Sequence, residues 1–207
     1  MGRLQLALVL ALAGGPAPVH AANLLVNGDF DDPPAEGWQC TPTARCSHDE
    51  LDVDGDASSG SALLSAEPAS PGSSVVLAQC VAVVPDRSYD FTGWARVSEA
   101  NPVTTILRLR MAWYSGAACT GSLIHSEVLA AAGEIGVWTP LARTRPSPPN
   151  AASGRFDVQF LKSPSVPGGA TARVDALSVP EPAAGAGALA ALATLGAHAR
   201  RRAAPSA

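Results

Sequence analysis

The sequence predicts an all-β fold, an antiparallel β-sandwich, for most of its 207 residues. Apolar and polar residues alternate with a period of two in several short segments, and clusters of Gly, Pro, Ser, Asn and Asp separate these segments. No segment keeps a 3.6-residue apolar period over three turns, which argues against amphipathic helices. Short strands at this spacing are typical of a sandwich.

Three segments carry the alternation most clearly, and each should bury one of its faces. They cover residues 88–97, 106–114 and 155–162. The residues expected to face the core are Tyr89, Phe91, Ala95, Val97, Leu107, Leu109, Met111, Trp113, Phe156, Val158 and Phe160. Residues 75–84 are apolar more continuously, so we expect that strand to be buried on both faces.

The N-terminal residues 1–22 have the pattern of a secretory signal peptide. Arg3 precedes the apolar stretch Leu4–Ala13, and small residues follow up to Ala22. This apolar stretch is too short to act as a stop-transfer helix, and cleavage is expected after Ala21 or Ala22. The pattern predicts a secreted protein.

The C-terminal residues 180–207 have a different pattern. Pro180, Glu181 and Pro182 precede an Ala/Gly/Leu run over residues 183–199, and Arg200, Arg201 and Arg202 follow it. The run would reach about 25 Å as a helix, enough to cross a bilayer core, with the arginines on the cytoplasmic side. A flexible Ala/Pro tail is the alternative.

This C-terminal pattern resembles the PEP-CTERM sorting signal of Gram-negative bacteria. In that family a Pro-Glu-Pro triplet, one transmembrane helix and an arginine cluster mark the substrate of a membrane protease called exosortase. The resemblance implies a protein that is anchored transiently in the inner membrane and then sorted to the cell surface, with an exosortase-type protease as a partner.

The middle domain, residues 23–179, carries a second resemblance. Residues 23–31, with Gly37 and Trp38 after them, are similar to the opening of galactose-binding-like jelly rolls. Residues 59–63, 79–83, 89–96, 138–141 and 172–179 continue that similarity in the same order. These jelly rolls include the carbohydrate-binding modules attached to xylanases. The resemblance therefore implies a jelly-roll β-sandwich.

Four cysteines in a secreted chain favour two disulfides. Of the three possible connectivities we favour Cys40 with Cys46 and Cys80 with Cys119. A zinc site would need paired short spacings such as Cys-x-x-Cys, which the sequence lacks.

The jelly-roll resemblance also implies a structural calcium ion between the first and last strands. Its ligands would come from Asp29 or Asp31 and from Asp175, with carbonyl oxygens from residues 52–56. Carboxylate and carbonyl oxygens are the ligands that calcium prefers. The alternative is that these acids only cap turns.

The residues opposite the expected core positions form a candidate ligand-binding face. If the three alternating segments are neighbours in one sheet, this face presents Trp94, Arg96, Arg108, Arg110, Tyr114, Asp157 and Gln159. An aromatic ring packs on the C–H face of a sugar, and arginines hold carboxylates, so this set favours an acidic saccharide. The alternative is a solvated face with Trp94 covered by a loop.

Catalytic and nucleic-acid-binding patterns are weak. No two glycines lie four apart, which excludes a Gly-x-Ser-x-Gly elbow, and only His48 and His125 remain between the two ends as bases. Glu127 and Asp157 are the acids considered as a hydrolytic pair. The formal net charge of −4 argues against nucleic acid as a partner.

These observations predict a secreted, surface-sorted and non-catalytic module that binds carbohydrate, an exopolysaccharide or extracellular matrix. A purely structural protein of the envelope or biofilm matrix would need no ligand and is the first alternative. A small glycan hydrolase is the second.

Overall fold

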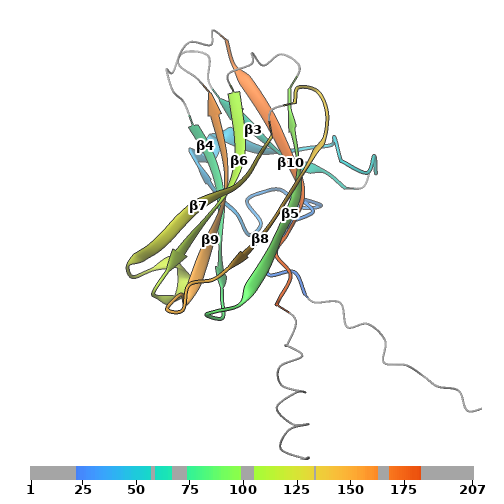
Figure 1. Ribbon diagram of the computed structural model, residues 1–207. Coiled ribbons are helices and arrows are strands. Elements are labelled where there is room, and N and C mark those ends of the chain that lie inside the picture. Colours follow the sequence, from blue (N-terminus) through green and yellow to red (C-terminus); the bar gives the residue numbers. More distant parts are fainter. Residues whose placement is uncertain are drawn as a thin grey trace, which may run out of the picture.

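The protein is described here by a computed structural model that covers residues 22–56, 59–66, 74–98, 105–132, 134–162 and 168–182. Within these residues two five-stranded antiparallel sheets pack face to face (Figure 1). The first, the β9 sheet, has the order β1-β4-β9-β6-β7, with bounds Gln39–Thr41, Ser74–Ala82, Ser153–Lys162, Thr105–Tyr114 and Leu123–Ala132. The second, the β10 sheet, has the order β2-β3-β10-β5-β8, with bounds Cys46–Asp49, Ser61–Ala66, Ala170–Ser178, Ser88–Val97 and Thr139–Pro146.

This arrangement confirms the predicted all-β sandwich, and its strand order is jelly-roll-like. The described helices are two single 3-10 turns, η1 (Thr43–Arg45) and η2 (Ala117–Cys119). No helix in the described ranges is both long and apolar enough to span a bilayer. Residues 1–21 of the expected signal peptide and residues 183–207 of the expected sorting signal lie outside the described residues.

The core forms where the apolar faces of the two sheets meet. Each residue expected to face the core from the three alternating segments is buried. Ring contacts run through the core from one end to the other, with centroid distances of 5.5 Å for Phe30–Trp38, 6.2 Å for Trp38–Phe156, 6.0 Å for Phe156–Phe91, 6.3 Å for Phe91–Trp113 and 6.1 Å for Trp113–Tyr89. Aromatic pairs at such distances add to the stabilisation from burial.

The expectation that residues 75–84 are buried on both faces is wrong. Val75, Leu77 and Val81 face the core, but Cys80 and Ala82 are exposed on the outer side. The outward residues of β4 include small side chains, which look apolar in the sequence yet cover little of the sheet. This exposed strip becomes part of the site described below.

The N-terminal segment is held against the last strand. The Asn23 side chain donates to the Leu177 carbonyl at 3.0 Å and accepts from the Val179 N–H at 2.9 Å. The Leu177 N–H in turn donates to the Gly28 carbonyl at 2.7 Å. Asn23 also pairs with Pro180, so the two described ends of the chain lie side by side (Figure 1).

Candidate functional site

A hollow lies on the outer face of the β9 sheet and has a volume of about 390 Å³. This volume is within the range of small-ligand sites. The hollow is bounded by residues from β1, β4, β6, β9 and the loop that contains η2: Gly37, Gln39, Ala78, Gln79, Cys80, Tyr114, Ala118, Cys119 and Arg155.

The strand register explains how these residues meet. Ala78 of β4 lies opposite Asp157 of β9, and Asp157 lies opposite Arg110 of β6. Cys80 lies opposite Arg155 in the same way. Residues paired across a sheet point to the same face, so small side chains on β4 lie beside long polar ones on β9 and β6. Of these strands, the residues that line the hollow include Ala78, Cys80, Tyr114 and Arg155.

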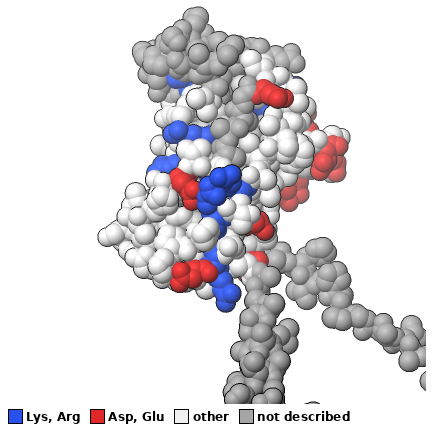
Figure 2. Space-filling view, viewed as in Figure 1, with Lys and Arg blue, Asp and Glu red and all other residues white. Residues whose placement is uncertain are grey.

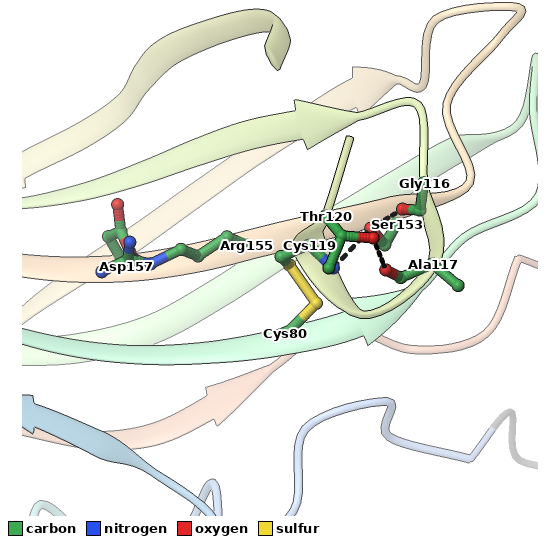
Figure 3. The surroundings of a disulfide bond; sticks show 8 residues. All are labelled: Cys80, Gly116, Ala117, Cys119, Thr120, Ser153, Arg155 and Asp157. Carbon is green, nitrogen blue, oxygen red and sulfur yellow. Dashed lines mark hydrogen bonds and ion pairs between the residues drawn. A yellow bond between two sulfur atoms is a disulfide. The ribbon is translucent and has the colours of Figure 1, made fainter. Parts of the chain in front are cut away.

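The η2 loop forms one wall, and a disulfide fixes it (Figure 3). Cys80 and Cys119 are bonded, which confirms the predicted pairing. The Cys119 N–H donates to Ser153 Oγ at 2.9 Å, and Ser153 Oγ donates to the Gly116 carbonyl at 2.6 Å. The loop is thereby tied to both β4 and β9. The second predicted disulfide, Cys40–Cys46, is also present.

The opposite wall comes from the start of β1. Gln79 has only 8% of its surface exposed, and its side chain donates to the Gly37 carbonyl at 2.9 Å and to the Val26 carbonyl at 3.0 Å. Its Oε1 accepts from the Val26 N–H at 2.8 Å. These contacts fix the segment before Gln39, whose exposed side chain borders the hollow.

A buried acid lies between arginines beside the hollow. Asp157 is only 2% exposed. Its Oδ1 lies 2.7 Å from Arg155 Nε in an ion pair that lacks hydrogen-bond alignment, and its Oδ2 lies 3.6 Å from Arg110 NH1. Burial raises the pKa of Asp157, and the charges of Arg155 and Arg110 oppose that rise. At the next outward pair of β6 and β9, Arg108 Nε donates to Gln159 Oε1 at 3.0 Å.

The assumption that the three alternating segments share one sheet is wrong. Strands β6 and β9 belong to the β9 sheet, whereas β5 belongs to the β10 sheet. Arg108, Arg110, Tyr114, Asp157 and Gln159 therefore share one outer face of the sandwich, and Trp94 and Arg96 lie on the opposite outer face. The predicted set divides into two groups because alternation distinguishes inward from outward positions but does not assign a strand to a sheet.

Residues 22–117 match the family model of a carbohydrate binding domain. The match begins with the first described residue and ends just after β6. It therefore contains β4 and β6 of the hollow but not β9. No curated protein sequence matches this chain.

The fold is similar to solved carbohydrate-binding modules. A family 16 module has 20% identity and a TM-score of 0.56, with 77% of this chain and 100% of that one covered. A module solved with beta-1,4-galactotriose, TmCBM61, has 13% identity and a TM-score of 0.54, with coverage of 78% and 99%. A xylan-binding domain of Paenibacillus barcinonensis, CBM22-1 of Xyn10C, has 13% identity and a TM-score of 0.54, with coverage of 79% and 97%. At these identities the similarity concerns the fold.

Trp94 and Arg96 lie on the outer face of the β10 sheet and are next to other residues of that face. Trp94 is half-buried between Pro140 of β8 and Asp175 of β10 in the strand register. Arg96 Nε donates to the Gly136 carbonyl at 2.9 Å. The same face holds a bidentate pair, in which Arg173 donates to the two oxygens of Asp49 at 2.8 and 2.9 Å. This hydrogen bonding lowers the pKa of Asp49.

Of the residues named for calcium, only Asp175 lies in a buried acidic setting. It is 2% exposed, and its oxygens accept from the Val53 N–H at 3.0 Å and the Ala176 N–H at 2.6 Å. Burial above all, with the charges of Asp52 and Asp54, raises the pKa of Asp175 to about 6. Asp29 and Asp31 are exposed. Within the described residues, no three His, Cys, Asp or Glu side chains are arranged to hold a metal ion.

The two acids considered for hydrolysis do not form a pair. Asp157 lies opposite Arg110 on the outer face, whereas Glu127 lies opposite the core residue Met111. The two carboxylates therefore leave the β9 sheet on different sides and cannot flank one glycosidic bond. Glu127 instead accepts from Arg145 Nε at 2.6 Å, a contact that joins β7 to β8. Figure 2 shows that acidic and basic side chains lie next to one another on the face drawn there.

Sequence reasoning missed Arg155, Gln39 and the η2 loop as parts of the site. Arg155 could have been predicted, because it begins the alternating segment 155–162 and shares the outward face with Asp157 and Gln159. Gln39 and the η2 loop carry no comparable local pattern. Their place in the site depends on pairing between β1 and β4 and on the disulfide to Cys80.

Proposed function

We propose that this protein is a non-catalytic module that binds a polysaccharide in the hollow on the outer face of the β9 sheet. The hollow itself carries the proposal, because it places an aromatic ring, Tyr114, beside the hydrogen-bonding side chains of Gln39 and Arg155. The similarity of residues 22–117 to a carbohydrate binding domain supports it. So does the fold similarity to a module solved with beta-1,4-galactotriose and to a xylan-binding domain.

The chemistry of the lining suits a sugar chain. A pyranose ring has an apolar C–H face that packs on an aromatic side chain, while its hydroxyls need donors and acceptors around it. Tyr114 supplies the ring, and Gln39 and Arg155 supply polar groups. The disulfide-fixed wall limits rearrangement on binding, which reduces the entropic cost of association.

Binding of the purified full chain to a panel of neutral and acidic polysaccharides, measured by affinity gel electrophoresis, tests this function. Tyr114→Ala is expected to weaken binding about fivefold or more, because it removes the stacking ring. Tyr114→Phe keeps the ring and is the matched control. Trp94→Ala removes an aromatic side chain from the opposite face and should leave binding unchanged.

A loss of binding in Trp94→Ala alone would place the site on the β10 sheet. Absence of binding to every polymer would refute the function.

We also propose that the protein is exported and sorted through its two ends. Residues 1–22 would direct secretion, and residues 180–207 would anchor the chain in the inner membrane until an exosortase-type protease acts there. The residues expected to mark this signal are Pro180, Glu181, Pro182, Arg200, Arg201 and Arg202. Two disulfides are consistent with an oxidising location such as the surface of a Gram-negative cell.

Calcium remains a proposal for Asp175 and the segment 52–56. Burial and the nearby charges of Asp52 and Asp54 disfavour the ionised form of Asp175, and a divalent cation would relieve this, with backbone carbonyls of the segment as further oxygen ligands. A resident ion would add local positive charge and keep Asp175 ionised. Asp29 and Asp31 are exposed and contribute no described contact to Asp175.

A further inference from the structure

The polar groups around the hollow are unequally exposed. The side chains of Arg110 and Arg155 are 31% and 37% exposed, whereas the Asp157 side chain between them is 3% exposed. Gln159, which accepts from Arg108, is also buried. A guanidinium only donates hydrogen bonds. A ligand on this part of the face therefore meets mainly donors, while the carboxylate and amide acceptors lie beneath them.

The charge on this face is also unbalanced. Arg108, Arg110 and Arg155 all point outward from the β9 sheet. Among the outward positions of its described strands, Asp157 is the only acid. One carboxylate does not neutralise three guanidinium groups. A neutral sugar would leave this positive charge uncompensated, whereas an anionic group on the ligand would compensate it.

The spacing of the arginines fits a ligand with repeated charges. Arg108 and Arg110 are two residues apart on β6, which places their Cα atoms about 7 Å apart along the strand. Arg155 is on the adjacent strand β9, opposite Ala112, so it is a diagonal neighbour of Arg110, about 8 Å away across the sheet. Arg108 and Arg155 make their described contacts through Nε. A guanidinium group can also bind a carboxylate through NH1 and NH2 with two parallel hydrogen bonds.

We propose that this site is selective for acidic polysaccharides, with a uronate carboxylate bound at the edge of the hollow by Arg155, which lines it, and by Arg110, which lies beside it on the same face. This inference rests on the proposed polysaccharide binding and specifies the ligand class. Tyr114 would pack against the sugar ring next to the bound carboxylate. The buried Asp157 orients the two guanidinium groups from below and is a positioning residue.

A matched pair of polymers tests the inference. Polygalacturonate carries the carboxylates, and its fully methyl-esterified form has the same backbone without the charge. In affinity gel electrophoresis of the full chain, polygalacturonate is expected to bind about tenfold or more tightly than its ester, as for a lost hydrogen bond to a charged group. Added salt should weaken only the binding of the acidic polymer.

Arg155→Gln and Arg110→Gln should each reduce this preference. Arg143→Gln, on exposed β8 of the other sheet, removes the same charge away from the hollow and is the control. Arg155→Lys keeps the charge but not the bidentate geometry, so it should restore the preference only in part. If Arg155→Gln does not fold because Asp157 loses its partner, the double variant Arg155→Gln/Asp157→Asn removes both charges and serves instead.

Two results would overturn the inference while leaving polysaccharide binding intact. One is equal binding of the acidic polymer and its ester. The other is binding of neutral xylan or galactan with no binding of polygalacturonate. Absence of binding to all of these polymers would instead contradict the proposed function itself.

Discussion

Gly28 occupies a position that cannot accommodate a side chain. A Cβ atom there would overlap the carbonyl oxygen of Leu177 in β10, which is a backbone atom and cannot rotate away. The same two residues are joined by the hydrogen bond from the Leu177 N–H to the Gly28 carbonyl, at 2.7 Å. The glycine of the opening motif therefore allows the N-terminal segment to lie directly on the last strand.

Gly28→Ala is expected to lower the free energy of unfolding by about 1–3 kcal/mol, because the backbone must move to relieve the overlap. Urea denaturation of the variant and the parent protein measures this loss. Gly55→Asn is the matched control, since a Cβ at Gly55 meets nothing within 4 Å and Asn tolerates its φ of +75°. Equal stability of Gly28→Ala and the parent would contradict the close approach.

Asp175 is expected to make stability depend on pH. Its pKa is about 6 in the folded protein against an ordinary value of 3.8, so the folded state binds the proton more tightly than the unfolded state. Stability should therefore fall as the pH rises from about 4 to about 6, by up to about 3 kcal/mol. The Asp175→Asn side chain cannot ionise. The stability of this variant should therefore depend less on pH, as thermal denaturation across that pH range would measure.

The calcium proposal adds a second readout at the same residue. A bound cation favours the ionised carboxyl, so calcium should raise the melting temperature at pH 7 and have little effect at pH 4, where Asp175 is protonated. Magnesium at the same concentration is the control for ionic strength. A melting temperature that calcium leaves unchanged at pH 7 would rule out an ion at this site.

At the scale of elements, the Cys80–Cys119 disulfide is expected to matter more for stability than Cys40–Cys46. The two bonds close segments with sequence separations of 39 and 6 residues. The chain-entropy treatment gives about 4 kcal/mol for the longer loop and about 2 kcal/mol for the shorter one. Urea denaturation of the Cys80→Ser/Cys119→Ser and Cys40→Ser/Cys46→Ser variants measures both losses. Removal of the longer link should also weaken binding, because the η2 loop forms a wall of the hollow. Equal losses from both variants would contradict the entropic account.

The strands illustrate what local sequence determines. The in–out pattern of β5, β6 and β9 follows from alternation and was predictable, because each strand buries one face and exposes the other. The assignment of β5 to the β10 sheet was not predictable in this way. It depends on pairing with β10 and β8, which lie more than forty residues further along the chain. Of the residues that line the hollow, the pattern therefore indicated Tyr114 of β6 but not Arg155 of β9.

The hollow shows the same limit for single residues. Arg110 and Tyr114 were predicted to point outward from the pattern of their own strand, and both do so, although only Tyr114 lines the hollow. Gln39 reaches the hollow through the short strand β1, and Ala118 through a loop that a disulfide holds. Such contacts arise from pairing between distant segments, so no local period indicates them. Cysteine pairing is a long-range contact that the sequence could specify residue by residue, and the predicted Cys80–Cys119 bond is present.

At the scale of the whole molecule, the two described ends of the domain meet. The Glu181 N–H donates to the Ala22 carbonyl at 2.8 Å, and Asn23 pairs with Pro180. The segment Pro180–Pro182 that marks the proposed sorting signal is thus attached to the folded domain. A protease acting on the signal would have to cut beyond Pro182 or first separate this segment from the N-terminal residues.

We predict that the mature protein in its native host ends near Pro182 and begins at Ala22 or Asn23. Cleavage beyond Pro182 leaves every strand of the described residues and both disulfides intact, so the domain should remain folded after processing. Intact-mass measurement of the surface protein tests both ends at once. Cleavage after Ala21 would retain the acceptor for the Glu181 N–H, whereas cleavage after Ala22 would remove it.

The matched control is a Pro180→Ala/Pro182→Ala variant, which keeps the fold but alters the triplet and should retain Arg200, Arg201 and Arg202. Recovery of the unaltered surface protein with those arginines still attached would show that no sorting protease removes this end.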